Sequence, residues 1–208
     1  MKPYYSSNGI TLYYARCETV LDSETFDAIV TDPPYPGRFE KEYHYYDGIL
    51  KPIRDLKCPQ AIFWTPSVPF PLDWQGLHVW DKATGINTQF ELIYFRGKKS
   101  GYKVHRFLSP HNTVRAKISG DAHTPHPSQK PVQLMQALIK QMGDARMICD
   151  PFSGSGSTLV ACRIMGKEAI GIERNKQYCD LTVERLERHR ETGCQAELRE
   201  IQTGSGAA

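Results

Sequence analysis

The chain has 208 residues, of which 40% are hydrophobic, so it can bury one core but not two comfortable ones. Its formal charge of +3 permits a nucleic-acid partner without requiring one. The six cysteines are scattered singly, so the sequence indicates neither a disulfide framework nor a zinc site, and a reducing, cytoplasmic compartment fits best. Residues 1–11 lack the pattern of a signal peptide, and no segment is apolar over the length of a membrane span, so we expect a soluble protein.

The first half of the chain is typical of short buried strands separated by turns. Residues 26–31 form an apolar run, and Pro33 and Pro34 end it because proline cannot donate to a sheet. Runs rich in aromatic and branched residues predict further strands over residues 61–64, 77–80 and 91–95. Residues 97–121 carry six lysines and arginines and are interpreted as a basic surface loop.

The second half alternates strands with helices. A helix over residues 132–142 is followed by a strand over 147–150, a glycine loop and a helix over 157–165. A strand over 168–173 and a helix over 176–190 complete the pattern. This alternation predicts an α/β fold: a single domain over residues 1–200 with a mostly parallel, doubly wound sheet and helices on both faces. We interpret residues 201–208 as a flexible tail.

The glycine loop has the composition of a ligand cradle. Gly154 and Gly156 allow the backbone to turn tightly and approach a ligand, while the following helix directs free N–H groups toward an anionic group such as a carboxylate. Glu173 ends the next strand, where an acid can accept hydrogen bonds from both ribose hydroxyls. A nicotinamide dinucleotide is disfavoured because a third glycine is missing, and a simple connecting turn is the remaining alternative.

The tetrapeptide Asp32-Pro33-Pro34-Tyr35 suits chemistry on an exocyclic amine. Such an amine is a poor nucleophile because its lone pair is delocalised into the ring, and acceptors aimed at its N–H bonds draw it toward tetrahedral geometry. Asp32 supplies a carboxylate and Pro33 a carbonyl on a backbone that the prolines stiffen. Tyr35 offers a ring for stacking a base rotated out of a duplex. The alternative is a proline-rich turn after a strand.

Together these two segments resemble the amino-methyltransferases of bacterial and phage DNA, which modify adenine N6 or cytosine N4. The tetrapeptide resembles the family's catalytic motif, and residues 150–158 resemble its cofactor loop. The catalytic motif comes first, as in the permuted, beta-type members. The resemblance implies a Rossmann-like methyltransferase fold with S-adenosylmethionine as cofactor and no metal. The catalytic residues that it implies are Asp32, Pro33, Pro34 and Tyr35.

The resemblance also implies a set of cofactor-binding residues. Residues 126–132 look like the segment that encloses the methionine part of the cofactor, and Glu173 matches the ribose-binding acid. Residues 12–17 are similar to a segment that usually contains Gly-Asp-Cys, but Ala15 and Arg16 replace its glycine and its acid. The implied cofactor-binding set is Asp150, Phe152, Ser153, Gly154, Ser155, Gly156, Thr158, Glu173, Cys17, His126 and Lys130.

The leading hypothesis is a site-specific DNA methyltransferase acting on adenine N6, as in restriction-modification, because cytosine-directed relatives more often have serine at the position of Asp32. Methylation of cytosine N4 is the close alternative. A second alternative keeps the enzyme class but makes RNA or a protein amide nitrogen the substrate. A third is a catalytically impaired nucleic-acid-binding homologue, which Arg16 and the short recognition region suggest. The expected partners are a flipped base in DNA and, since the recognition region is short, a second subunit of a homodimer. We expect a cytoplasmic protein encoded by a bacterium or phage.

Overall fold

The computed structural model describes residues 1–35, 48–82, 90–107, 109 and 126–203, with the backbone alone from residue 190 on. Five parallel strands form the centre of one sheet, in the order β2-β9-β8-β3-β4. These strands are β2 (Ile10–Tyr14), β9 (Glu168–Glu173), β8 (Met147–Asp150), β3 (Ala28–Thr31) and β4 (Gln60–Trp64).

Antiparallel pairing extends this parallel centre at both ends. At one end β1 (Tyr5–Ser7) pairs with β2. At the other end β6 (Phe90–Arg96) pairs antiparallel with β4, and β5 (Gly76–Asp81) pairs antiparallel with β6. The last strand, β7 (Gly101–Arg106), pairs parallel with β5. The result is a nine-stranded sheet in which the predicted strands over 61–64, 77–80 and 91–95 all occur.

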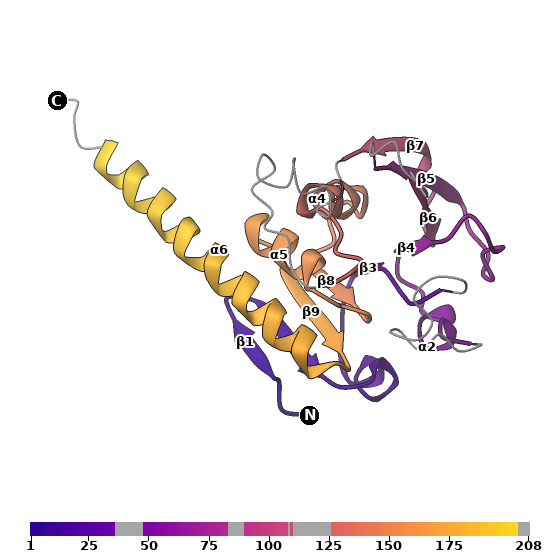
Figure 1. The fold of residues 1–208 in the computed structure, drawn as a ribbon, viewed down its shortest axis with the longest axis horizontal. Helices are drawn as coiled ribbons and strands as arrows, with labels where there is room; N and C mark the ends of the chain where they lie inside the picture. The colour runs from indigo at the N-terminus through magenta and orange to yellow at the C-terminus, as the bar shows by residue number, and fades with distance from the viewer. Residues whose placement is uncertain (36–47, 83–89, 108, 110–125, 204–208) are drawn as a thin grey trace.

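Residues of β3 alternate between two apolar cores, one on each face of the sheet. Ala28 and Val30 belong to the core that includes Leu134 and Leu159 from the long helices, whereas Ile29 belongs to the opposite core with Ile53. The first face is covered by α4 (Val132–Gln141), α5 (Ser157–Ile164) and α6 (Lys176–Thr203) (Figure 1). Short elements cover the second face: η1 (Cys17–Thr19), η2 (Leu21–Ser23) and α2 (Lys51–Arg54). The predicted α/β fold with helices on both faces is confirmed.

The interpretation of residues 97–121 as a loop is wrong for Gly101–Arg106, which form β7. These residues pair in register with β5, from Gly76 opposite Gly101 to Asp81 opposite Arg106. The side chains of β7 are mostly exposed, so no apolar alternation marks the strand in the sequence. Residues 110–121 lie outside the described residues.

Two further elements differ from the expectation. The last helix runs to Thr203, beyond the predicted end at residue 190, and so includes the first residues of the expected tail. Residues 191–203 include three Glu, two Gln, one Ala, one Leu and one Arg, whose helix propensity offsets the cost of Gly193. The hairpin of β1 and β2 was not predicted, although Asn8-Gly9, both with positive φ, is a strong hairpin signal. No helix in the described ranges is long and apolar enough to cross a membrane.

Candidate active site

The two loops singled out in the sequence follow neighbouring parallel strands. The tetrapeptide from Asp32 to Tyr35 follows β3, and the glycine loop follows β8, which pairs directly with β3. At the strand ends the Thr31 hydroxyl donates to Asp150 Oδ1 at 2.6 Å, and both side chains are buried. Since the carboxyl ends of parallel strands meet at one edge of a sheet, the two loops face a common space.

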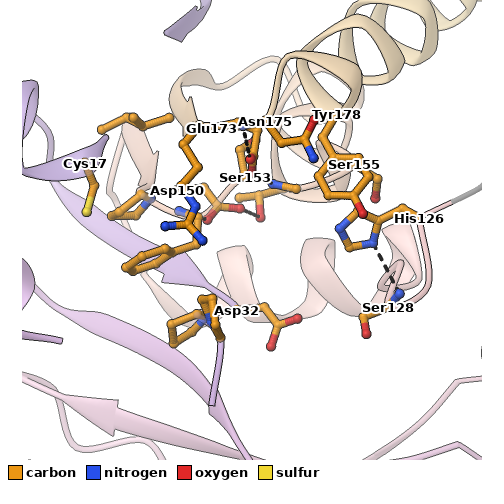
Figure 2. Close-up of a pocket in the computed structure, with 18 of the residues that line it drawn as sticks. Cys17, Asp32, His126, Ser128, Asp150, Ser153, Ser155, Glu173, Asn175 and Tyr178 are labelled. Carbon is orange, nitrogen blue, oxygen red and sulfur yellow. Dashed lines mark hydrogen bonds between the residues drawn. The ribbon is translucent and has the colours of Figure 1, made fainter. Parts of the chain in front are cut away.

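A cavity of about 460 Å³ occupies this space, within the range of small-molecule sites. Figure 2 shows Asp32 on one side of it and Glu173 and Asn175 on the opposite side. All the residues implied by the family resemblance line the cavity except Gly156. The lining residues from that set are Asp32, Pro33, Pro34, Tyr35, Asp150, Phe152, Ser153, Gly154, Ser155, Thr158, Glu173, Cys17, His126 and Lys130.

Gly154 brings the backbone of the loop close to the cavity. Its φ is +52°, and a Cβ there would lie 2.9 Å from His126 Nε2. Its N–H donates to Glu173 Oε2 at 2.9 Å. Beside it, the Ser153 Oγ is buried and has no hydrogen-bond partner among the described residues. The glycine loop therefore lies at the cavity with a backbone that only glycine readily adopts at position 154.

Gly156 shapes the loop from outside the cavity. It is the N-cap of α5 with a φ of +77°, and a Cβ would lie 2.4 Å from Thr182 Cγ2 on α6. The Arg185 guanidinium, also from α6, donates to the Ser155 carbonyl at 2.6 Å. The loop is thus packed against α6, and Gly156 permits this packing.

We expect Gly156→Ala to lower the free energy of unfolding by more than the about 1–3 kcal/mol that a left-handed non-glycine residue costs. Thr182 is fully buried and cannot move away from the added methyl group. Gly166→Ala is the matched control, because Gly166 has a φ of +64° but open space around its Cβ position. Urea denaturation of both variants measures the difference, and equal losses would mean that the Thr182 clash costs nothing.

Asp150 and Thr158 are hydrogen-bonded to each other in the wall of the cavity. Asp150 Oδ1 accepts hydrogen bonds from Thr31 and from the Phe152 N–H, and Oδ2 accepts from the Thr158 hydroxyl at 2.5 Å. Burial raises the pKa of Asp150 to about 6, although these hydrogen bonds to its charged form oppose the shift. Both side chains therefore fix the relative positions of β3, β8 and α5.

Glu173 ends β9 and joins the glycine loop to the start of α6. Its Oε2 accepts from Gly154 N–H, and its Oε1 accepts from Asn175 N–H at 2.7 Å. Burial raises its pKa, and the two backbone hydrogen bonds oppose that shift. Each carboxylate oxygen retains a second lone pair, so hydroxyls can still bind there.

The His126 ring lies beside the ring of Tyr178 on α6, with centroids 4.4 Å apart, and its Nδ1 accepts from the Ser128 N–H at 3.2 Å. Both rings line the cavity. Neither Tyr178 nor Arg185 was predicted, because only the folded chain brings α6 against the glycine loop.

The two oxygens of the Asp32 carboxylate differ in their surroundings. Its Oδ2 contacts the Lys130 ammonium, whereas its Oδ1 is buried without a hydrogen-bond partner in the part of the chain that the structure describes. Burial raises the pKa of Asp32, and the positive charge of Lys130 opposes that rise. Lys130 was expected to help enclose the cofactor, but its ammonium lies against the catalytic motif.

The segment that departs from the family pattern also faces the cavity. Ala15, Arg16 and Cys17 line it, and so does Glu18, which forms an ion pair with Arg16 at 3.7 Å. Burial raises the pKa of the Cys17 thiol to about 12, so Cys17 stays protonated. An acid is therefore present at this part of the cavity, two residues after the position where the family usually has one.

These features fit S-adenosylmethionine, a nucleoside that also carries amino-acid and sulfonium groups. Glu173 can accept from hydroxyls, and Gly154 permits close approach. Asp32 adds a spare acceptor across the same cavity. Fold and site together define the class of Rossmann-like methyltransferases.

Comparison with known proteins narrows this class. A family model described as DNA methylase matches residues 78–184, just over half of the chain. The chain belongs to this family of DNA amino-methyltransferases, which use S-adenosylmethionine and act on adenine N6 or cytosine N4.

Individual relatives agree with the family match. The Type II methyltransferase M.ScaI of Streptomyces caespitosus is 25% identical over 260 aligned residues, covering 89% of this chain and 84% of that protein. Five further curated relatives match over 62 to 80 residues, only 20–27% of their own lengths.

Two solved structures share the fold. The M1.HpyAVI complex with S-adenosylmethionine has a TM-score of 0.60 at 21% identity, covering 85% of this chain and 98% of that one. The cytosine-N4-specific PvuII DNA methyltransferase has a TM-score of 0.64 at 14% identity, covering 88% of both chains.

Proposed function

We propose that this chain transfers the methyl group of S-adenosylmethionine to the N6 amine of adenine at specific sites in DNA. The observation that carries the proposal is the meeting of the two loops at one cavity, which Asp32 lines with a carboxylate whose Oδ1 is buried and has no hydrogen-bond partner among the described residues. An unpaired buried acceptor is costly unless a ligand donor satisfies it. The N–H of an exocyclic amine is such a donor.

On the cofactor side of the cavity, residues of the chain would bind and orient S-adenosylmethionine. Glu173 would hold the ribose hydroxyls, because its carboxylate is already fixed by two backbone N–H groups. Ser153 and Gly154 would meet the amino-acid end where α5 begins, and His126 with Tyr178 would close the cavity beside it. When bound, the cofactor supplies an electrophilic methyl group on a positively charged sulfur.

On the base side, Asp32 Oδ1 and the Pro33 carbonyl would accept from the two N–H bonds of the amine. This polarises the nitrogen toward the geometry that it needs to attack. Tyr35 would stack on the base after its rotation out of the duplex. The Tyr35 ring packs against Trp64 at 5.9 Å between centroids, which holds it at the cavity wall.

The identity of the methylated base tests this proposal directly. We expect duplex DNA treated with the protein and S-adenosylmethionine to yield N6-methyldeoxyadenosine after digestion to nucleosides, measured by mass spectrometry. The Asp32→Ala variant is the control for contaminating activity. Detection of N4-methyldeoxycytidine without N6-methyldeoxyadenosine would show that the target is cytosine and not adenine. Methyl transfer to RNA or protein but never to DNA would overturn the DNA assignment.

Two further parts of the proposal concern the setting of the reaction. A second copy of the chain would supply recognition surface in a homodimer, because the basic window of residues 97–121 is the short stretch available for target recognition between the two motifs. The enzyme would act in the cytoplasm of a bacterium or an infected cell, where DNA is accessible. The five cysteines among the described side chains are free thiols, which suits a reducing compartment.

A further inference from the structure

Four side chains of alternating charge form a line that begins at the partly exposed Asp32 and continues through three buried residues. The Lys130 ammonium contacts Asp32 Oδ2 and lies 3.2 Å from Glu91 Oε2 on β6. Glu91 Oε1 in turn lies 2.6 Å from the ammonium of Lys82, the residue after β5. Side-chain exposure along the line is 20% for Asp32, 5% for Lys130, 5% for Glu91 and 10% for Lys82. The catalytic motif is therefore connected electrostatically to the antiparallel part of the sheet.

Stability alone does not explain this arrangement. Removing charged groups from water costs several kcal/mol for each ion, by order of magnitude, and well-packed apolar side chains often serve stability as well or better. The line nevertheless sits in a region with large apolar neighbours, since the Lys130 ammonium lies 5.0 Å from the centroid of Phe63 and 5.9 Å from that of Trp80. A role in the reaction would explain why these charged side chains lie among apolar neighbours.

Lys130 is held from several directions, so its ammonium has little freedom. Its backbone carbonyl accepts from the Ser157 hydroxyl at 2.8 Å, which ties it to the first residue of α5. Its ammonium is placed between two carboxylates and beside two aromatic rings. Lys130 thus links the helix of the cofactor loop to the carboxylate of the catalytic motif.

We propose that Lys130 is a positioning residue that holds Asp32 as an anion through Oδ2 and leaves Oδ1 free for the amine, with Glu91 setting the strength of this hold. The inference rests on the proposed function and deepens it. Glu91 draws the Lys130 ammonium partly away from Asp32, and Lys82 compensates the charge of Glu91. Neither Glu91 nor Lys82 needs to touch the base or the cofactor.

Lys130 and Glu91 act on Asp32 in opposite directions. Among the residues that the structure describes, the charged groups with the largest influence on Asp32 are Lys130, Glu91 and Asp150. Burial is the largest influence and raises the pKa of Asp32; Lys130 lowers this pKa, whereas Glu91 and Asp150 raise it. Lys130→Met should therefore raise the pKa of Asp32 and shift the acidic limb of the pH–rate profile to higher pH. Glu91→Gln should lower the pKa and shift that limb to lower pH.

The test is a pH titration of the free protein labelled with ¹³C at its aspartate carboxyl groups. The Asp32 signal is assigned by its absence in Asp32→Asn. We expect shifts of about one pH unit or more, upward in Lys130→Met and downward in Glu91→Gln, as for single charges a few ångströms away. Lys130→Arg keeps the charge and should return the pKa toward that of the unmodified protein. Single-turnover methyl transfer to DNA, measured across the same pH range, should follow the same order.

Lys57→Met is the matched control, because Lys57 is exposed in the turn before β4, at the opposite edge of the sheet. It should leave the titration of Asp32 unchanged. Shifts in the same direction, or none, in Lys130→Met and Glu91→Gln would overturn the inference. If Lys130→Met fails to fold, a Glu91→Gln protein with an unshifted Asp32 still refutes it. The titration needs no substrate, so absence of N6-methyladenine from the unmodified protein would reject the proposed function and leave this test intact.

Discussion

Asp32→Ala is expected to slow methyl transfer to DNA by about 10³-fold, comparable to the loss of a preorganised group that stabilises a transition state. The substitution removes the carboxylate of Asp32 from the cavity wall, including the Oδ1 that has no hydrogen-bond partner among the described residues, while Glu173 and the glycine loop are unchanged. Affinity for S-adenosylmethionine should therefore stay close to that of the unmodified protein. Single-turnover rates and calorimetric titration with the cofactor measure the two effects separately.

Asp55→Ala is the control for this variant, since Asp55 is exposed and its only described ion pair is with Arg54. It should retain full activity. Asp32→Asn adds a sharper comparison, because Lys130 would attract the amide oxygen and turn the amide N–H₂ toward the base. A comparable loss of cofactor affinity in Asp32→Ala would contradict the assignment of Asp32 to the amine.

Glu173→Gln is expected to weaken S-adenosylmethionine binding by about 10- to 100-fold, the equivalent of one charge-assisted hydrogen bond. Its two oxygens already accept from Gly154 and Asn175, and the glutamine N–H₂ would face one of these N–H groups. The loss should appear in calorimetric titration and as a raised KM for the cofactor. The methyl-transfer rate at saturating cofactor should fall much less.

Glu168→Gln provides the matched control on the same strand, because Glu168 begins β9 at the opposite end and is exposed. Its cofactor affinity should equal that of the unmodified protein. Equal affinity in Glu173→Gln as well would remove Glu173 from the binding site. A thermal melt without cofactor shows whether the Glu173 variant keeps its fold, because a loosened glycine loop would also lower the melting temperature.

The sequence predicted four of the five strands of the parallel centre, β9, β8, β3 and β4, because local patterns determine them, whereas β2 was not predicted. The buried runs that became β3, β8 and β9 are short, apolar and ended by proline, glycine or an acid. The meeting of the two loops also followed, since adjacent parallel strands place their carboxyl ends together. Strand β7 could not be predicted in this way, because its exposed side chains carry no apolar period.

The internal contacts of the site could be predicted much less well. Asp32 and Lys130 are separated by 98 positions, and Lys130 precedes α4 whereas Glu91 lies on β6, so no local pattern relates them. The sequence correctly marked both Asp32 and Lys130 as lining one site. Their ion pair depends on how α4, β6 and the catalytic motif pack, which only the folded chain determines.

The place of β7 at the end of the sheet has a consequence for the behaviour of the protein in solution. An end strand presents backbone groups on one side that can recruit a strand from another molecule. Lys103 and Arg106 lie on this strand, and Tyr102 is 78% exposed beside them. The positive charge of Lys103 repels the same strand of an approaching molecule, whereas that of Arg106 is paired with Asp81 at 2.9 Å, so we expect high salt to weaken the protection of this edge against aggregation.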